Sequence, residues 1–238
     1  MTSRIENVRE LLARTRYVVL GFDGPICQLF SGPSATALAR ARLDRLTEPD
    51  LRDALLAEEE RDPTDPYRAL TAVAGRHPDG EAVARLDAWL TRTELAAVRT
   101  AMPTAYADPL LHTWAAVGAR LAVATGTSAQ AVTSYLNTRG LTDRFAPYIF
   151  GRAPHRGTAL PRPAPLELAL GAMGAEPDAS LMIGAAPEDH AAAHRAGVRF
   201  LGYARRPARA RALREAGVPA RCVTDSLEPL LRGLRELP

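Results

Sequence analysis

The sequence predicts an α/β protein, in which a parallel sheet carries helices on both faces and an all-helical segment is inserted. From residue 105 onward, short apolar runs of strand length alternate with helical stretches rich in Ala, Leu and Arg. This alternation is typical of a parallel sheet covered by its crossover helices. One more apolar run, at 17–22, supplies a strand before the insertion. The expected strands are 17–22, 121–124, 148–150, 181–183, 198–201 and 221–223, and clear helices are expected at 129–139 and 165–173.

The insertion at 31–104 has a different pattern. Its apolar residues recur at helical spacing, as at Leu86 and Leu90, and prolines separate its segments. We find no strand candidate in it and expect a small helical bundle, with helices near 34–46, 51–61, 66–76 and 81–102. The predicted organisation is an α/β core formed by 1–30 and 105–238, with the helical insertion between its two parts.

The composition is that of an ordinary soluble globular protein. Of the 238 residues, 47% are hydrophobic and 24% are charged. No apolar run reaches the ~20 residues that span a bilayer, so we expect no membrane association. The first six residues lack the apolar segment of a secretion signal, and Ser3 and Glu6 have the spacing of a capping box that opens a short helix. We therefore expect a cytoplasmic protein.

All 30 basic residues are arginine, and this excludes two kinds of chemistry. A Schiff base needs a lysine, and a standard P-loop needs Gly-Lys. The two cysteines, Cys27 and Cys222, fit no metal-ligand spacing, and we expect reduced buried thiols. Cys27 lies four residues beyond Asp23, so an alternative role as a substitute nucleophile stays open.

The apolar run at 17–22 leads into the acidic residue Asp23 and a Gly-Pro turn. A carboxylate there lies at the carboxyl end of a strand, where open α/β sheets bind their ligands. The segment resembles motif one of the haloacid dehalogenase-like superfamily, a hydrophobic strand followed by Asp-x-Asp-Gly-Thr. Aligning Asp23 with the second aspartate puts Gly21 at the first, which is the nucleophile of the family. Pro25 replaces the threonine and removes one backbone donor.

Three further motifs follow in the family's order. Thr125 and Gly126 end a second strand and resemble motif two, and Arg162 in Arg-Pro-Ala-Pro resembles the cation of motif three. Motif four places aspartates where this chain has Ala185 and Asp189. The resemblance implies a Rossmann-like core and identifies 31–104 as a helical cap over the active site.

The resemblance also implies what each residue would do. In the family, the first aspartate attacks phosphorus, the second protonates the leaving oxygen, and Mg²⁺ is held by the first carboxylate, the second residue's carbonyl and motif four. Asp23 would thus be the acid/base and a carbonyl ligand of Mg²⁺, and Asp189 a carboxylate ligand. Thr125, Gly126 and Arg162 would bind phosphate. With the carboxylates at Gly21 and Ala185 absent, we expect weak Mg²⁺ binding.

We interpret the chain as a phosphatase-like protein with impaired catalysis, which binds a phosphorylated small molecule or a protein partner. Loss of a catalytic nucleophile costs on the order of 10⁶ in turnover. A competing alignment makes Asp23 the nucleophile, at the expense of a two-residue deletion in the loop. In that case the chain is an active hydrolase that uses Asp23, Thr125, Arg162 and Asp189.

Each surviving residue also has a structural interpretation. Asp23 could cap its loop, Thr125 could belong to a turn, and Arg162 could lie on the surface. Asp189 could stabilise the first turn of the helix that follows it, where negative charge is favourable. His190 and His194, four apart on that helix, could share a metal, although no third ligand is evident.

A different class of function is suggested by five arginines between Arg205 and Arg214, in a chain of net charge +3. This basic helix could contact an acidic partner or nucleic acid. The run has no interleaved aromatic residues and no recognised nucleic-acid motif, so we do not expect a nucleic-acid partner and interpret it as a solvated helix edge.

Overall fold

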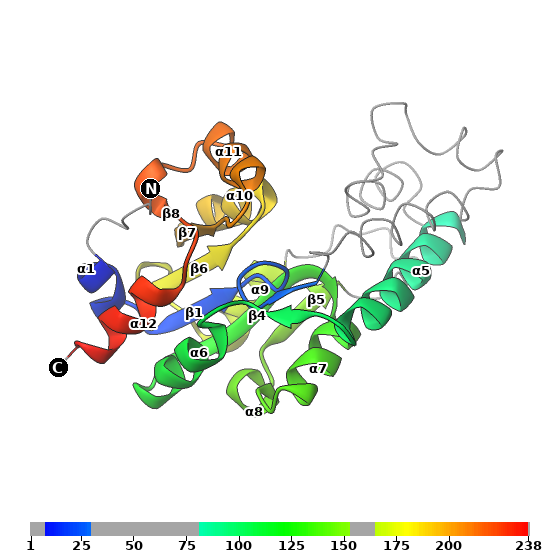
Figure 1. Ribbon diagram of the computed structural model, residues 1–238, viewed down its shortest axis with the longest axis horizontal. Helices are drawn as coiled ribbons and strands as arrows, with labels where there is room; N and C mark the ends of the chain where they lie inside the picture. Colours follow the sequence, from blue (N-terminus) through cyan, green and yellow to red (C-terminus); the bar gives the residue numbers. More distant parts are fainter. Residues whose placement is uncertain (1–7, 30–80, 153–164, 238) are drawn as a thin grey trace.

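The computed structural model describes residues 8–29, 81–152 and 165–237 (Figure 1). Several predictions lie outside these residues: the capping box at Ser3 and Glu6, the first three helices of the insertion, and the motif-three arginine, Arg162. The bounds of the predicted cap therefore stay a prediction.

The core is a six-stranded sheet with the strand order β5-β4-β1-β6-β7-β8, in which every neighbouring pair is parallel. The strands are β1 (Tyr17–Leu20), β4 (Arg120–Ser128), β5 (Ile149–Arg152), β6 (Ser180–Gly184), β7 (Arg199–Tyr203) and β8 (Val223–Thr224). The predicted Rossmann-like α/β fold is confirmed. Because β1 pairs with β4 on one side and β6 on the other, motif one lies between motifs two and four.

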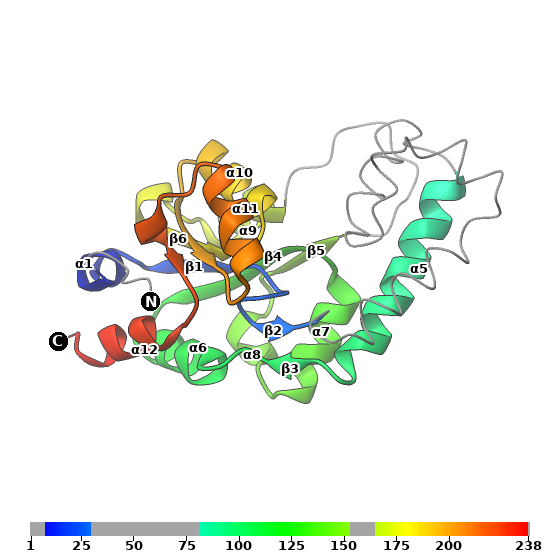
Figure 2. The same cartoon turned by 45° about the horizontal axis from the view of Figure 1, so that its top comes forward.

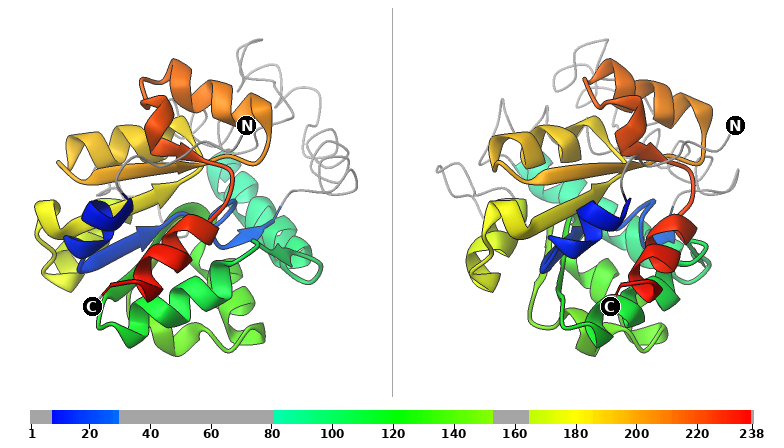
Figure 3. Two further views of the ribbon diagram at one scale, coloured as in Figure 1. Left: turned by 60° about the vertical axis from the view of Figure 1, so that its left-hand side comes forward. Right: turned by 90° about the vertical axis from the view of Figure 1, so that its left-hand side faces the viewer.

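Helices cover both faces of this sheet, as Figures 1 and 3 show. One face carries α1 (Val8–Ala13), α6 (Ala107–Ala116), α7 (Ala129–Thr138), α8 (Thr142–Phe145) and α12 (Glu228–Arg235). The other carries α9 (Pro165–Met173) and α10 (Pro187–Arg195), and α11 (Pro207–Glu215) packs near β7 and β8. Short 3-10 turns, η2 (Pro177–Ala179) and η3 (Ala220–Cys222), precede β6 and β8. No helix among the described residues is long and apolar enough to cross a membrane.

The strands are apolar on both faces because both faces are covered. In β1, Val18 and Leu20 join the cluster beneath α6 and α12, whereas Val19 points to α9 and α10. These three side chains are almost completely buried. Continuous burial of this kind explains why the strands were visible in the sequence as uninterrupted apolar runs.

One expectation for the insertion is wrong at its carboxyl end. The predicted helix at 81–102 is α5 (Glu81–Val98), and it ends four residues early. Met102–Pro103 form β3, which pairs antiparallel with β2 (Cys27–Gln28), so this stretch does contain a strand (Figure 2). Pro103 disfavours helical backbone at Met102 and removes a helix donor, which explains the early end.

The last predicted strand, 221–223, is displaced. Ala220–Cys222 form η3, and the strand is Val223–Thr224. Only two residues pair with β7, at Gly202 and Tyr203. An edge strand this short leaves little periodic signal in the sequence.

Candidate functional site

The parallel strands bring the motif residues to one edge of the sheet, the edge formed by their carboxyl ends. Asp23 follows β1, Thr125 lies near the end of β4, and Asp189 follows β6. Arg209 follows the next strand, β7, and belongs to the first turn of α11. In open α/β proteins this edge is where ligands bind.

The backbone at Gly21 continues the pairing of β1 with β6. Its N–H donates to the carbonyl of Ile183 over 2.8 Å. A Cβ atom built at Gly21 would lie 3.5 Å from Oδ2 of Asp189 and 3.6 Å from Cα of Gly184, which are ordinary contacts. A Cβ therefore fits here and would face Asp189. Close packing against a Cβ does not account for the glycine at this position.

Both carboxylate oxygens of Asp23 are bonded to protein groups. Oδ1 accepts a hydrogen bond from the N–H of Leu29 at 2.8 Å, and Oδ2 pairs with Nη2 of Arg209 at 3.2 Å. Within the same loop, the N–H of Gly24 donates to the carbonyl of Cys27 at 2.7 Å. Asp23 thus holds its loop closed, as the structural interpretation of this residue expects. Its side chain is 24% exposed and reachable by a small ligand.

Gly24 is confined by the motif-four loop and α11. Its φ of 113° lies in the left-handed region, which favours glycine. A Cβ there would lie 2.7 Å from Cβ of Ala185 and 3.0 Å from Nη1 of Arg209. Thr104 adds a short hydrogen bond from its hydroxyl to the carbonyl of Gly24. The loop after β1 is therefore pressed directly against Ala185 and Arg209.

Thr125 is buried within the last part of β4. Its Oγ1 accepts a hydrogen bond from the N–H of Thr127 at 3.2 Å, and the threonine is 9% exposed. Ser128 caps α7 by accepting from the N–H of Ala131 at 3.3 Å. The carbonyl of Gly126 accepts from Nη1 of Arg152 at 2.6 Å. The predicted phosphate contacts Thr125 and Gly126 are thus at the expected edge, in the last part of β4, where its pairing with β5 is irregular.

Asp189 stabilises the start of α10. Its Oδ2 accepts hydrogen bonds from the N–H groups of Ala185 and Ala186, at 2.9 and 3.1 Å. A Cβ built at Gly184 would lie 2.5 Å from Cβ of Asp189, so the carboxylate is held closely over the end of β6. Burial raises the pKa of Asp189 above its ordinary value, although the two backbone hydrogen bonds oppose this shift.

The described residues do not fit the magnesium ion that the family implies. Gly21 and Ala185 offer no side-chain oxygen, and Asp189 directs one oxygen at two backbone N–H groups. Mg²⁺ needs several oxygen ligands in near-octahedral geometry. Within the described ranges there is no group of three or more His, Cys, Asp or Glu that could hold a metal ion. The predicted ligands Asp23 and Asp189 share one edge without forming a metal centre.

Sequence reasoning missed Arg209 as a site residue. It was counted among five arginines of a solvated helix edge, yet its side chain reaches Asp23 and is only 38% exposed. The position of Arg209 could have been inferred from the order of strands and helices along the chain. Arg209 begins the helix after the strand at 198–201, so it must lie at the same edge as the other motif residues.

Sequence reasoning also missed a buried ionic cluster at the other side of this edge. Nε of Arg152 donates to Asp87 at 2.5 Å, and Nη1 and Nη2 donate to the two oxygens of Glu94 at 2.8 and 3.2 Å. The N–H of Ser128 also donates to Glu94 at 2.9 Å. The Glu94 side chain is 0% exposed. Burial lowers the pKa of Arg152, but the bonds to Glu94 and Asp87 outweigh it and raise that pKa.

This cluster attaches α5 to the end of the sheet. Asp87 and Glu94 are seven residues apart, and so lie two turns apart on one face of α5. Arg152 is the last residue of β5. Figure 2 shows α5 extending away from the sheet from its place beside α7. A charged pair at this spacing inside an otherwise amphipathic helix was the only sign of the cluster in the sequence.

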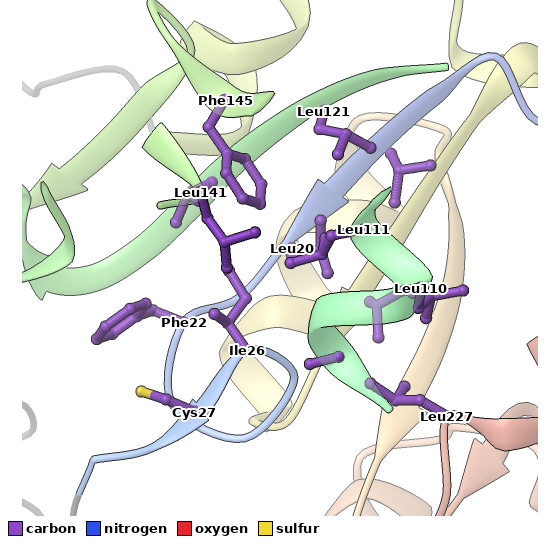
Figure 4. Close-up of a cluster of buried hydrophobic side chains, with 14 of the residues drawn as sticks. Leu20, Phe22, Ile26, Cys27, Leu110, Leu111, Leu121, Leu141, Phe145 and Leu227 are labelled. Atoms are coloured by element: carbon purple, nitrogen blue, oxygen red, sulfur yellow. The ribbon is translucent and has the colours of Figure 1, made fainter. Parts of the chain in front are cut away.

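Two minor candidates find no support. Cys27 is fully buried, in the apolar cluster that Figure 4 shows with Phe22 and Ile26. Burial and then the charge of Asp23 raise the pKa of its thiol, so the thiolate needed for attack is disfavoured. The rings of His190 and His194 lie 6.3 Å apart, and the described residues provide no third ligand.

Known proteins place the chain in context. The family model described as "Haloacid dehalogenase-like hydrolase" matches residues 81–203, just over half of the chain. This span contains motifs two to four and leaves out the loop of Gly21 and Asp23. No curated protein sequence gives a match.

Solved structures agree with the family model on the fold. A predicted phosphatase from Clostridium acetobutylicum is 16% identical, with a TM-score of 0.62 over 94% of this chain and 99% of its own. A HAD-superfamily hydrolase of subfamily IA from Geobacter sulfurreducens is 20% identical, with a TM-score of 0.56 over 93% and 97%. At these identities the likeness concerns the fold alone. Taken with the matched family model, the sheet order and the ordered motifs, it shows that the chain belongs to the haloacid dehalogenase-like hydrolase family.

Proposed function

We propose that this family member has little phosphatase turnover and uses the edge around Asp23 to bind a phosphorylated small molecule or a protein partner. The observation that carries the proposal is Gly21. It has room for a Cβ that would face Asp189, and it supplies no side chain. Without a carboxylate there, the residue at the family's nucleophile position cannot form the phosphoaspartate on which the family's hydrolysis depends.

The size of the expected loss in turnover supports a binding role. Removal of a nucleophile from residues that act as a unit costs on the order of 10⁶ in turnover, and positioning alone leaves a small residual acceleration. Asp23 is bonded to Leu29 and Arg209, and Asp189 to two backbone N–H groups. Mg²⁺ would gain little from these groups, so its binding is weak.

One observation favours the alternative of an active hydrolase that uses Asp23. Its carboxylate is partly exposed and lies at the carboxyl ends of the strands, where ligands bind in open α/β sheets. For attack, one carboxylate oxygen would have to break its hydrogen bond to Leu29 or its ion pair with Arg209. The loop after β1 would then have to move.

Another observation bears on the alternative of an interaction surface. Four of the five arginines of the basic run, Arg205, Arg206, Arg211 and Arg214, are exposed. They could contact an acidic partner. If they bind nucleic acid, the affinity must fall steeply with salt, because several phosphates would be neutralised.

The deciding experiment is phosphate release from a panel of phosphomonoesters with Mg²⁺, for the wild-type chain beside Asp23→Asn. We expect no turnover that depends on Asp23. Circular dichroism of both proteins verifies that an inactive sample is folded. Turnover by the wild type that disappears in Asp23→Asn would make the chain a working enzyme and overturn the proposal.

Binding is measured on the same panel by isothermal titration calorimetry. Saturable binding of a phosphomonoester by a protein that does not hydrolyse it is the expected result. A folded protein that neither hydrolyses nor binds any member of the panel would remove the small-molecule half of the proposal and leave the protein partner.

A further inference from the structure

A guanidinium lies where this loop meets motif four. Nη2 of Arg209 is 3.2 Å from Oδ2 of Asp23. Its Nη1 and Cβ of Ala185 both lie within 3.0 Å of the point where a Cβ would stand at Gly24. Ala185 is the position at which the family carries an aspartate. Arg209 therefore pairs with the acidic loop, and its guanidinium and the altered motif-four position face the same glycine.

The charges of the described residues at this edge suit a fixed side-chain cation. A site with several carboxylates needs a divalent ion to offset their repulsion and to attract phosphate. Here Gly21 and Ala185 are neutral, and Oδ2 of Asp189 accepts hydrogen bonds from two backbone N–H groups. The charge of Arg209 pairs with Asp23 and also acts on the nearby Asp189. Arginine keeps that charge at all relevant pH values.

Arg209 also retains donors for a ligand. A guanidinium has five N–H groups, arranged in a fork that suits phosphate oxygens. Among the described residues, Asp23 is the hydrogen-bond partner recorded for this side chain, through Nη2 alone. The side chain is 38% exposed. An oxyanion can thus bind Arg209 without breaking its contact with Asp23.

The geometry points to Arg209 as the built-in cation of this site, which binds the phosphoryl group of a phosphomonoester without a divalent metal ion. This inference rests on the proposed binding function and specifies its chemistry. It also agrees with the described residues, which supply no group of three or more His, Cys, Asp or Glu that could hold a metal ion.

A consequence concerns restored carboxylates. An aspartate at position 185 would extend from a Cβ that, like Nη1 of Arg209, lies against Gly24. The new carboxylate would pair with the guanidinium. Gly21→Asp with Ala185→Asp would therefore not recover metal binding until Arg209 is also removed.

The first test is calorimetric titration with inorganic phosphate, once with EDTA and once with Mg²⁺. The proteins are wild type, Arg209→Gln and Arg211→Gln, the last being a matched control on the exposed part of the same helix. We expect equal affinity with EDTA and Mg²⁺, a loss of about 10-fold to 100-fold in Arg209→Gln, and little change in Arg211→Gln. Binding that requires Mg²⁺ and is unaffected by Arg209→Gln would overturn the inference, while the proposed binding function would stand.

The second test does not depend on the identity of the ligand. Mn²⁺ binding, followed by electron paramagnetic resonance, is compared for Gly21→Asp/Ala185→Asp with and without Arg209→Gln. We expect at least about 10-fold tighter binding when Arg209 is absent. Equal Mn²⁺ affinity in the two variants would contradict the role of Arg209 as the resident cation. Turnover in the Asp23 assay, by contrast, would overturn the proposed function without deciding this point.

Discussion

The two sides of one sheet edge use charge in opposite ways. On the side of β1, β6 and β7, two of the family's acidic positions hold Gly21 and Ala185, and the ion pair of Asp23 with Arg209 is partly exposed. On the side of β4 and β5, Arg152 is largely buried between two carboxylates of α5. The first side would be catalytic in an active relative, and the second holds two segments together.

The difference shows where buried charge is indispensable in this chain. Glu94 accepts hydrogen bonds from Arg152 through both oxygens and from the N–H of Ser128, so removing one partner leaves a desolvated charge. Asp23 keeps contact with water, and its pairing is weaker. The described structure therefore depends on the cluster at α5 far more than on the remains of the catalytic motifs.

The largest loss of folding stability is expected from Arg152→Met. This change leaves Glu94 and Asp87 buried without their cation, which costs about 3–5 kcal/mol. Urea unfolding gives the free energy directly. The control is Arg139→Gln, which breaks the more exposed pair with Asp108 and should cost at most about 1 kcal/mol. Similar losses in the two variants would show that the cluster has no special structural weight.

Two glycines at the ends of adjacent strands provide the next comparison. A Cβ at Gly184 would meet Asp189 at 2.5 Å and Phe200 at 2.8 Å, whereas a Cβ at Gly21 makes contacts of 3.5 Å or more. Gly184→Ala should cost about 1–3 kcal/mol by overpacking. Gly21→Ala should be neutral or stabilise the fold by up to about 1 kcal/mol. The same unfolding measurement checks both, and a large loss in Gly21→Ala would refute the space assigned to a side chain there.

A smaller loss of folding stability is expected when the ion pair between Asp23 and Arg209 is broken. Arg209→Gln removes a partly exposed ion pair and should change the free energy of unfolding by less than about 1 kcal/mol. Thermal melts of wild type and variant provide the comparison. A loss on the scale of Arg152→Met would place the main structural ion pair on the β1 side and reverse the comparison.

The smallest effect is a difference in pH dependence at Asp189. Its pKa is raised above 3.8, so the folded state binds the proton more tightly than the unfolded state. The resulting stabilisation is present below pH 3.8 and is lost as the pH rises through the raised pKa. Relative to the wild type, Asp189→Asn should therefore gain stability from pH 4 upward. Urea unfolding between pH 4 and pH 8 measures this, and a relative loss for the variant would mean that the backbone donors outweigh burial.

The fold could be predicted because its strands appear in the sequence as short apolar runs that recur along the chain. Strands such as β6 are buried on both faces and remain apolar throughout, and the residues after them set the edge. The positions of Asp23, Thr125 and Asp189 at one edge follow from this topology. The loop contact of Asp23 and the helix-start contacts of Asp189 also match the structural interpretations of these two residues, whereas Thr125 lies in β4.

The missed residues depend on contacts that no local pattern encodes. Arg152 is separated from Asp87 by 65 residues and Arg209 from Asp23 by 186, and both look like ordinary members of an arginine-rich chain. The strand at Met102–Pro103 was missed for the same reason. Its partner is the distant β2, and two residues carry no periodicity.

Calorimetric titration of the wild-type chain with Mg²⁺ tests most directly whether the β1 side has ceased to be a metal centre. We predict no saturable binding up to about 1 mM, a Kd that corresponds to about 4 kcal/mol of binding free energy. Asp189→Asn should give the same trace. A single site of micromolar affinity in the wild type, abolished in Asp189→Asn, would contradict this and restore the catalytic interpretation of the edge.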